Sequence, residues 1–408
     1  MKPINDEAYE AICYDWEVNR SLPETFVGFV DETIRDGLQT PYCPQFDLND
    51  RVTALCHMDE CGFSDCILGM VGVDDERISQ LISYFGEHDV SVFPWLLCRV
   101  DQADISSAVS HFGQGGDKVG INLFLNLGPL RHLAESWDED RLFDKFLSVL
   151  KIAKAGFGRI RIAFEDASRT HPRLIARAIA MTSGFGIERL TIADTCGTLS
   201  PSGVSNFIDH VRIMLRDSNC RSLLEWHGHN DRGMAVACSL AAIESGASYV
   251  HGTMLGIGER NGNAALDQIV ANLGFLQPKI CDWHALRNYH DFIAEKFQNN
   301  LFSAYPFFGK YSNATSTGTH SAAMFKAIRN NRPNLARILF SPISPIGVNT
   351  PPTFLVSHLT GRLGVTAALS ERSLRCDDAT VSRVLSFAKS VERTITNDEL
   401  NLISCERT

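Results

Sequence analysis

Two histidines that are one residue apart end an apolar segment of this chain. The segment reads "LLEWHGHND" and carries His227 and His229. In a β-strand, residues i and i+2 point to the same side, so both imidazoles would converge on one face. Two neutral imidazoles on one face suit a divalent metal ion better than they suit an apolar core. A lone His-x-His pair also fits a purely structural role, so the interpretation depends on other residues.

Several other predicted strands also end in ionisable or amide side chains. The segments are "DETIRDGLQ", "FEDASR", "IADTCG" and "GIGERNGN". The candidate residues in them are Arg35, Asp36, Gln39, Glu165, Asp166, Arg169, Asp194, Thr195, Glu259, Arg260 and Asn263. Each residue alone is compatible with a structural ion pair or a turn. Five strand ends that carry such groups together indicate a metal-dependent active site.

The elements that must position these residues alternate between short β-type runs and amphipathic helical segments. The runs cover residues 25–32, 65–71, 91–99, 118–127, 159–166, 189–195, 222–229 and 248–255. Several are almost continuously apolar, which is typical of parallel strands covered on both faces. Eight strand–helix units over about 250 residues predict an α/β fold of the (β/α)8 TIM-barrel type, whose functional groups lie at the carboxyl ends of the strands. A doubly wound open sheet is the alternative, but no GxGxxG follows the first strand.

We expect three regions in the chain. Residues 1–24 form an N-terminal extension, residues 25–280 form the barrel, and residues 281–408 form a smaller, mostly helical accessory region. Helical patterns cover 282–297 and 378–395 of that last region. A polar connection, "GKYSNATSTGTH", separates them from each other.

The composition excludes several classes of partner. The formal net charge is −10 and there is no basic stripe, so we expect no nucleic-acid partner. No apolar run reaches the length of a membrane span, and the N-terminus carries acidic residues where a signal peptide needs an apolar core. Twelve cysteines are scattered without a CxxC pair and indicate reduced thiols. We therefore expect a cytoplasmic protein that acts on small molecules.

Five motifs occur in order, each at a predicted strand end. They are "RDGLQ", "FEDASRT", "IADTCG", "HGHNDRGMAVACSLAAIESGA" and "GIGERNGNAALDQIV". Together they resemble the metal-dependent family of 2-isopropylmalate synthases, homocitrate synthases and hydroxymethylglutaryl-CoA lyase, over roughly residues 27–275. The segment "STGTH" extends the resemblance to residue 320. The combination of "HGHND" with the downstream "GIGER" is specific, whereas "RDG" alone is weak.

The resemblance implies a role for each candidate residue. The implied ligands of a divalent cation are Asp36, His227, His229 and Asn263, with Zn, Mn, Mg and Co all open. Arg35 would stabilise a developing oxyanion, and Glu165 would take part in proton transfer. The implied substrate contacts are Gln39, Arg169 and Thr195. In the synthases, a histidine in the segment similar to "STGTH" reaches the partner's active site, which implies a homodimer in which His320 acts as a base.

The implied reaction is a Claisen-type condensation. An acyl-CoA, first of all acetyl-CoA, would react with a 2-oxo acid to give CoA and a 2-hydroxy dicarboxylic acid of the 2-isopropylmalate, homocitrate or citramalate type. The loop "GIGERNGN" lacks the cysteine that the lyase uses there, which favours condensation over cleavage. A hydroxymethylglutaryl-CoA lyase-like carbon–carbon lyase and a non-catalytic metal-binding paralogue are the two alternatives.

Four departures separate this chain from the family pattern. Leu38 stands where the synthases carry glutamate, and Ile67 replaces a carboxylate that would face the barrel mouth. Phe340 stands where a tyrosine of the accessory region is expected. The chain beyond His320 is too short for the leucine-binding regulatory domain of typical isopropylmalate synthases. We therefore expect that domain and its feedback inhibition to be absent.

Overall fold

The computed structural model describes residues 21–113, 118–297, 303–341 and 352–405. The chain divides into two compact units, one from Ser21 to Gln298 and one that contains Asn299–Thr408. Most of the expected N-terminal extension, residues 1–24, lies outside the described residues. None of the helices in the described part of the chain has the length and apolar character needed to cross a bilayer.

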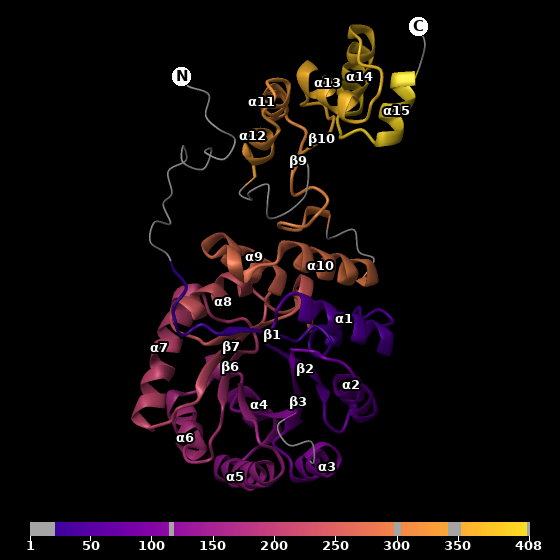
Figure 1. Cartoon of the computed structure of the whole chain (residues 1–408). Helices are drawn as coiled ribbons and strands as arrows, with labels where there is room; N and C mark the ends of the chain where they lie inside the picture. Colours follow the sequence, from indigo (N-terminus) through magenta and orange to yellow (C-terminus); the bar gives the residue numbers. More distant parts are fainter. Residues whose placement is uncertain (1–20, 114–117, 298–302, 342–351, 406–408) are drawn as a thin grey trace. The chain divides into compact units, whose positions relative to one another are not determined.

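Eight parallel strands close into a barrel in the first unit, in sequence order (Figure 1). They are β1 (Gly28–Asp31), β2 (Asp65–Met70), β3 (Phe93–Arg99), β4 (Gly120–Asn126), β5 (Ile160–Glu165), β6 (Arg189–Asp194), β7 (Leu223–Gly228) and β8 (Tyr249–Gly252). The barrel closes because β1 pairs with β8, with Phe29 beside Val250. The predicted TIM barrel is confirmed, and the open doubly wound sheet is wrong.

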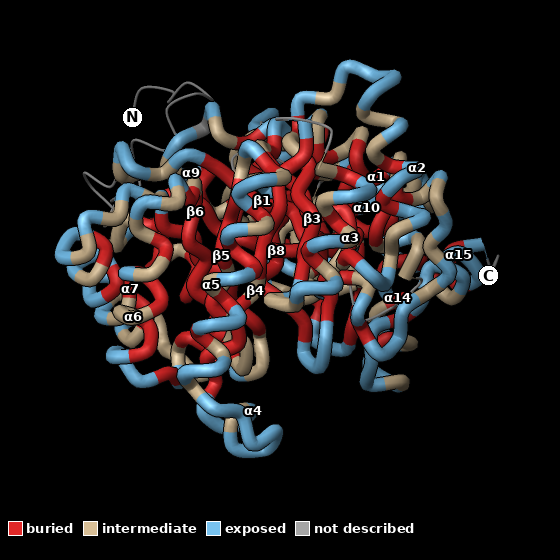
Figure 2. The backbone as a smooth tube through the Cα atoms, turned by 90° about the horizontal axis from the view of Figure 1, so that it is seen from below, coloured by how far each residue is buried: buried red, intermediate tan, exposed pale blue. Residues whose placement is uncertain are grey.

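Helices follow these strands. They are α1 (Leu48–Glu60), α2 (Asp75–Glu87), α3 (Gln102–Phe112), α4 (Pro129–Glu135), α5 (Glu139–Gly156), α6 (Pro172–Thr182), α7 (Pro201–Asp217), α8 (Ala235–Glu244) and α9 (Leu266–Leu276). All of them except α4, which carries Arg131 at the barrel mouth, cover the outside of the barrel. Polar N-caps begin several of them: the side chains of Asp47, Asp138 and Ser200 accept hydrogen bonds from the first turns of α1, α5 and α7. Figure 2 shows the barrel strands as buried and the outer turns of α6 and α7 as exposed.

Charged side chains fill part of the barrel interior. Arg189 Nη1 lies 2.9 Å from Asp65 Oδ2 and 3.2 Å from Glu225 Oε1, and Arg161 Nε lies 3.0 Å from Glu225 Oε2. The guanidinium of Arg161 also lies 4.2 Å from the ring centroid of Trp95. Because each buried charge has an opposite charge beside it, the network is held in one arrangement.

The structure corrects the boundary expected at residue 280. Helix α10 (Trp283–Phe297) belongs to the barrel unit, which extends to Gln298. Tyr289 of α10 is fully buried and stacks on His57 of α1, at 5.6 Å between ring centroids. His290 Nδ1 lies 2.9 Å from Asp267 Oδ2 of α9. The apolar face that predicts this helix is therefore buried against α1 and α9.

The docking of α10 leads to a pH prediction for Asp31. Burial raises the pKa of Asp31 from 3.8 to about 7, while hydrogen bonds from Thr33 and Tyr289 oppose the shift. The folded state therefore holds a proton that the unfolded state releases near pH 4, so this contribution to stability is lost as the pH rises toward 7. We therefore compare the unfolding free energies of Asp31→Asn and the wild type. The value for the variant minus that for the wild type should increase by ~4 kcal/mol in total over this range and stay at the higher value above pH 7.

Urea unfolding of both proteins at pH 4, 5, 6, 7 and 8 checks this expectation. The relevant quantity is the difference between the unfolding free energies of the two proteins, because the other titrating groups contribute equally to both. A difference that stays constant across the series would contradict the assignment of the buried proton to Asp31.

The second unit is mostly helical, as expected for the accessory region. Its elements are β9 (Ala314–Thr315), α11 (Gly318–Arg329), α12 (Pro333–Ile338), β10 (Thr353–Phe354), α13 (Arg362–Glu371), α14 (Asp378–Val391) and α15 (Asn397–Cys405). Buried side chains from several of these elements form one core, among them Met324, Val365 and Val384. The two short strands pair in parallel, with Ala314 beside Thr353.

Candidate metal centre and active site

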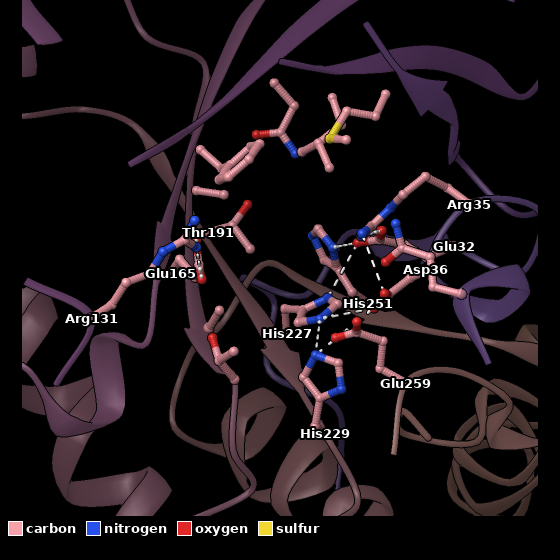
Figure 3. Close-up of a pocket in the computed structure, with 18 residues that line it drawn as sticks. Glu32, Arg35, Asp36, Arg131, Glu165, Thr191, His227, His229, His251 and Glu259 are labelled. Carbon is pink, nitrogen blue, oxygen red and sulfur yellow. Dashed lines mark hydrogen bonds and ion pairs between the residues drawn. The ribbon is translucent and has the colours of Figure 1, made fainter. Parts of the chain in front are cut away.

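A cavity of about 230 Å³ lies at the carboxyl ends of the barrel strands (Figure 3). Seven of the ten predicted site residues line it, together with Glu259 from the loop after β8. Those seven are Arg35, Asp36 and Gln39 after β1, Glu165 at the end of β5, Thr195 after β6, His227 in β7 and His229 just beyond it. Residues from distant parts of the sequence therefore meet at one site, as the barrel fold predicts.

Asp36, His227 and His229 bring three metal-competent atoms together. His227 Nε2 lies 3.2 Å from His229 Nε2 and 3.4 Å from Asp36 Oδ2. His229 Nε2 lies 3.9 Å from the same carboxylate oxygen. All three side chains are buried, and their ligand atoms lie within 4.8 Å of one another. This spacing is what a single ion shared by one carboxylate and two imidazoles requires.

Asn263 supplies a fourth donor beside this group. Its backbone bridges to that of His229, and its Nδ2 donates a hydrogen bond to the carbonyl of Ile257 at 3.2 Å. Its Oδ1 is buried and, like Asp36 Oδ2, has no hydrogen-bond partner among the residues that the structure describes. Gly258 lies against the amide, since a Cβ there would come within 2.3 Å of Asn263 Nδ2. Two buried oxygens without a partner and two imidazoles fit a divalent cation.

The electrostatics keep these groups in their metal-binding protonation states. Burial, together with neighbouring His227, lowers the pKa of His229 to about 4, so the ring is neutral at pH 7. Burial by itself would raise the pKa of Asp36, but Arg35 and His227 outweigh it and hold this pKa well below its usual range. A neutral imidazole and an ionised carboxylate are the forms that bind metal.

Glu165 and Thr195 lie in the cavity with partners of their own. Arg131 Nη1 of α4 donates to Glu165 Oε1 at 3.1 Å, and Figure 3 shows this pair across the cavity from Asp36 and His229. The Thr195 hydroxyl accepts a hydrogen bond from the backbone N–H of Asp166 at 2.8 Å. These contacts fix both side chains before any substrate binds.

The structure does not bring Arg169 into the cavity. Its guanidinium donates two hydrogen bonds to the carboxylate of Asp166, both at 2.7 Å. The two residues are three positions apart, and the tight turn after β5 brings their side chains together. Arg131, which the sequence reasoning missed, is the arginine that lines this side of the cavity. His320 belongs to the other unit, where its exposed ring stacks on Phe340 at 3.9 Å, so its role in catalysis stays a prediction.

Ile67 does not face the cavity as expected. It is fully buried beside Val30 and Trp95. The register of β1 and β2 pairs Asp31 with Cys66, and its continuation places Glu32 next to Ile67. Glu32 lines the cavity, so the carboxylate next to Ile67 is supplied by the residue that follows β1 and not by β2.

Sequence reasoning missed several residues of the cavity. They are Glu32, Met70, Asn122, Phe124, Arg131, Ala163, Thr191, Ala193 and His251. One signal was available for His251, because a histidine interrupts the apolar run "SYVHGTML" of β8. A polar side chain inside a barrel strand requires a polar partner, which here is Glu32.

Comparisons with known proteins agree with this geometry. The HMGL-like family profile matches residues 27–294. The chain is similar to a putative (R)-citramalate synthase of Archaeoglobus fulgidus, with 24% identity over 372 residues, which cover 90% of this chain and 71% of the relative. It is also similar to a 2-isopropylmalate synthase of Heliobacterium modesticaldum, with 25% identity over 91% of this chain and 72% of the relative.

The solved structures support the fold. A hydroxymethylglutaryl-CoA lyase from Pseudomonas aeruginosa superposes with a TM-score of 0.57 and 19% sequence identity, over 68% of this chain and 95% of that chain. This agreement covers the barrel architecture alone.

Proposed function

Because the chain belongs to the HMGL-like family, we propose that it catalyses a metal-dependent Claisen condensation of an acyl-CoA, first of all acetyl-CoA, with a 2-oxo acid. The observation that carries the proposal is the convergence of Asp36, His227 and His229 beside Arg35 in one cavity. The backbone of Asn263 is bridged to that of His229, and its Oδ1 has no partner within the described part of the chain. The two relatives compared by sequence are named a putative (R)-citramalate synthase and a 2-isopropylmalate synthase, and the loop after β8 has no cysteine.

The proposed reaction joins two carbon atoms and then hydrolyses a thioester. A base removes a proton from the carbon next to the thioester carbonyl, and that carbon bonds to the ketone carbon of the 2-oxo acid. The ketone oxygen takes up a proton, and water cleaves the thioester to release CoA and a 2-hydroxy acid with one carboxylate more than the oxo acid. A divalent cation held by the four ligands would act as a Lewis acid toward the ketone.

The other cavity residues have distinct tasks in this proposal. Arg35 Nη1 lies 3.3 Å from Asp36 Oδ1, so its charge stands beside the ketone position and stabilises the developing oxyanion. Thr195 and Gln39 bind the oxo acid, and Glu165 takes part in proton transfer, with Arg131 beside it. Because Arg131 is cationic, the far end of the oxo acid would be neutral or anionic rather than cationic.

A second cavity, of about 590 Å³, would hold the phosphates of the acyl-CoA. It shares Phe124 and Arg131 with the first cavity and is also lined by Arg99, Arg141 and Lys145. Trp137 contributes an aromatic surface to the same cavity. Cationic side chains next to a reaction cavity suit a donor whose carrier group is polyanionic.

Arg141→Glu should therefore raise the KM for acetyl-CoA about tenfold, since one charge-assisted contact is replaced by repulsion. The KM for the oxo acid should stay unchanged, because Arg141 does not line the first cavity. Steady-state kinetics with each substrate varied in turn measure both constants. Equal changes in the two KM values would contradict this placement of the donor.

A homodimer in which His320 serves the partner's site is part of the proposal. Neither His320→Ala nor Arg35→Ala should be active by itself, whereas a heterodimer of the two contains one intact site. Equal mixing after dissociation should then restore roughly a quarter of wild-type activity for a two-fold symmetric dimer. Verified heterodimers that remain inactive would show that His320 does not act across an interface.

The proposed function is tested by CoA thiol release from acetyl-CoA with Mn²⁺-loaded protein. The acceptors are pyruvate, 2-oxoisovalerate, 2-oxoglutarate and oxaloacetate, with a reaction without acceptor as the control. Release that requires one oxo acid and stops with a chelator supports condensation. Acetyl-CoA formation from 3-hydroxy-3-methylglutaryl-CoA without an oxo acid would favour the lyase alternative. Metal binding without either reaction would favour the non-catalytic paralogue.

A further inference from the structure

Glu32 lies between a metal-ligand candidate and the arginine of the cavity. The residue is 1% exposed and directly follows the last residue of β1. Its Oε1 lies 3.2 Å from His227 Nδ1 and 2.6 Å from His251 Nδ1, and its Oε2 accepts a hydrogen bond from Arg35 Nη2. Figure 3 shows the carboxylate beside all three partners.

We propose that Glu32 is a positioning residue that orients the metal ligand His227 and the oxyanion-stabilising Arg35 at the same time. This inference rests on the metal site of the proposed function. A carboxylate next to Nδ1 keeps the proton on that nitrogen and leaves the lone pair on Nε2. In His227, Nε2 is the atom that faces Asp36 and His229.

The interior of the barrel holds Glu32 in place. His251 of β8 contacts Glu32 through Nδ1 and lies 3.2 Å from Glu225 Oε2 through Nε2. Glu225 is in turn held by Arg189 and by the Thr191 hydroxyl, which donates to its Oε2 at 2.5 Å. All of these side chains are buried. A continuous chain of contacts therefore connects the barrel interior to the metal ligand.

A second metal ion on Glu32, His227 and His251 is the competing interpretation, because their ligand atoms also lie close together. The separation of His251 Nδ1 and Glu32 Oε1, 2.6 Å, argues against it. Two ligand atoms on one ion, each bonded at about 2.0–2.2 Å, stand about 3 Å apart or more. The shorter separation is that of a hydrogen bond between imidazole and carboxylate.

Mn²⁺ titration calorimetry of the full chain tests the proposal. The wild type should bind one ion per chain, and Glu32→Gln should bind it about 10- to 100-fold more weakly. His251→Gln, which removes the support of Glu32, should weaken binding by a smaller factor, and the double variant should be no weaker than Glu32→Gln alone. Asp267→Asn is the matched control, because Asp267 and His290 form a buried carboxylate–imidazole pair that does not line the cavity.

Each outcome of the Mn²⁺ titration either supports or overturns the positioning role of Glu32. Wild-type Mn²⁺ affinity in Glu32→Gln would overturn the positioning role while the proposed function stands, and two ions per chain would overturn it in favour of a second metal site. A wild type that binds no Mn²⁺ would overturn both proposals. If Glu32→Gln does not fold, as thermal unfolding would reveal, His251→Gln takes its place. Unchanged affinity in that variant, or an equal loss in Asp267→Asn, would overturn the inference.

Discussion

His229→Ala should lose both the bound metal and the condensation activity. The side chain is buried, and its Nε2 lies within 4 Å of both His227 and Asp36, so the variant removes one of the three clustered ligand atoms. A Lewis-acid metal contributes several kcal/mol to the transition state, which corresponds to a decrease in kcat of about 10³-fold or more. Metal content of the purified protein and initial rates of thiol release measure the two effects.

His210→Ala is the matched control, because His210 is an exposed histidine on α7 outside the cavity. This variant should keep wild-type metal content and rate. Chelation of the wild type should reproduce the loss seen in His229→Ala, and added Mn²⁺ should reverse it in the wild type alone. Full activity of metal-free His229→Ala would sink the metal-dependent mechanism.

Arg35→Ala should show the second large effect, confined to kcat. Arg35 lines the cavity between Glu32 and Asp36, and in the proposed reaction its charge would stabilise the negative charge that develops on the ketone oxygen. The loss of one such donor costs roughly 10²- to 10³-fold in kcat. The affinity for Mn²⁺ should not fall, because removal of a cation next to Asp36 does not remove a ligand. Rates at saturating substrate and calorimetric titration with Mn²⁺ separate these two quantities.

Arg35→Lys distinguishes charge from geometry. Lysine keeps the positive charge but cannot hold Glu32 and Asp36 together as a guanidinium does. It should recover only a small part of the lost rate. If Arg35→Ala instead lost metal and kcat in equal measure, the arginine would be a support of the metal site rather than a group that stabilises the transition state.

Local patterns in the sequence were enough to predict the barrel and most of its site. The period of two along a strand places His227 and His229 on one face, and apolar β-branched runs mark strands that are covered on both sides. Because parallel strands of a barrel all end at one rim, Arg35, Asp36, Glu165 and Thr195 could be assigned to a common cavity from their positions alone. The structure confirms that they line it.

Only the tertiary structure decided which of the polar side chains meet. Glu32 and His251 lie 219 positions apart in the sequence and touch because β1 pairs with β8 when the barrel closes. The sequence could not show whether Arg169 or Arg131 lines the cavity. Arg169 is held away from it by an ion pair with Asp166, three residues earlier, and this pair forms only in the folded turn. The boundary at α10 also depends on packing, since an amphipathic helix does not specify the surface that covers its apolar face. Patterns within one element are local properties of the chain, whereas contacts between elements follow from the closure of the barrel.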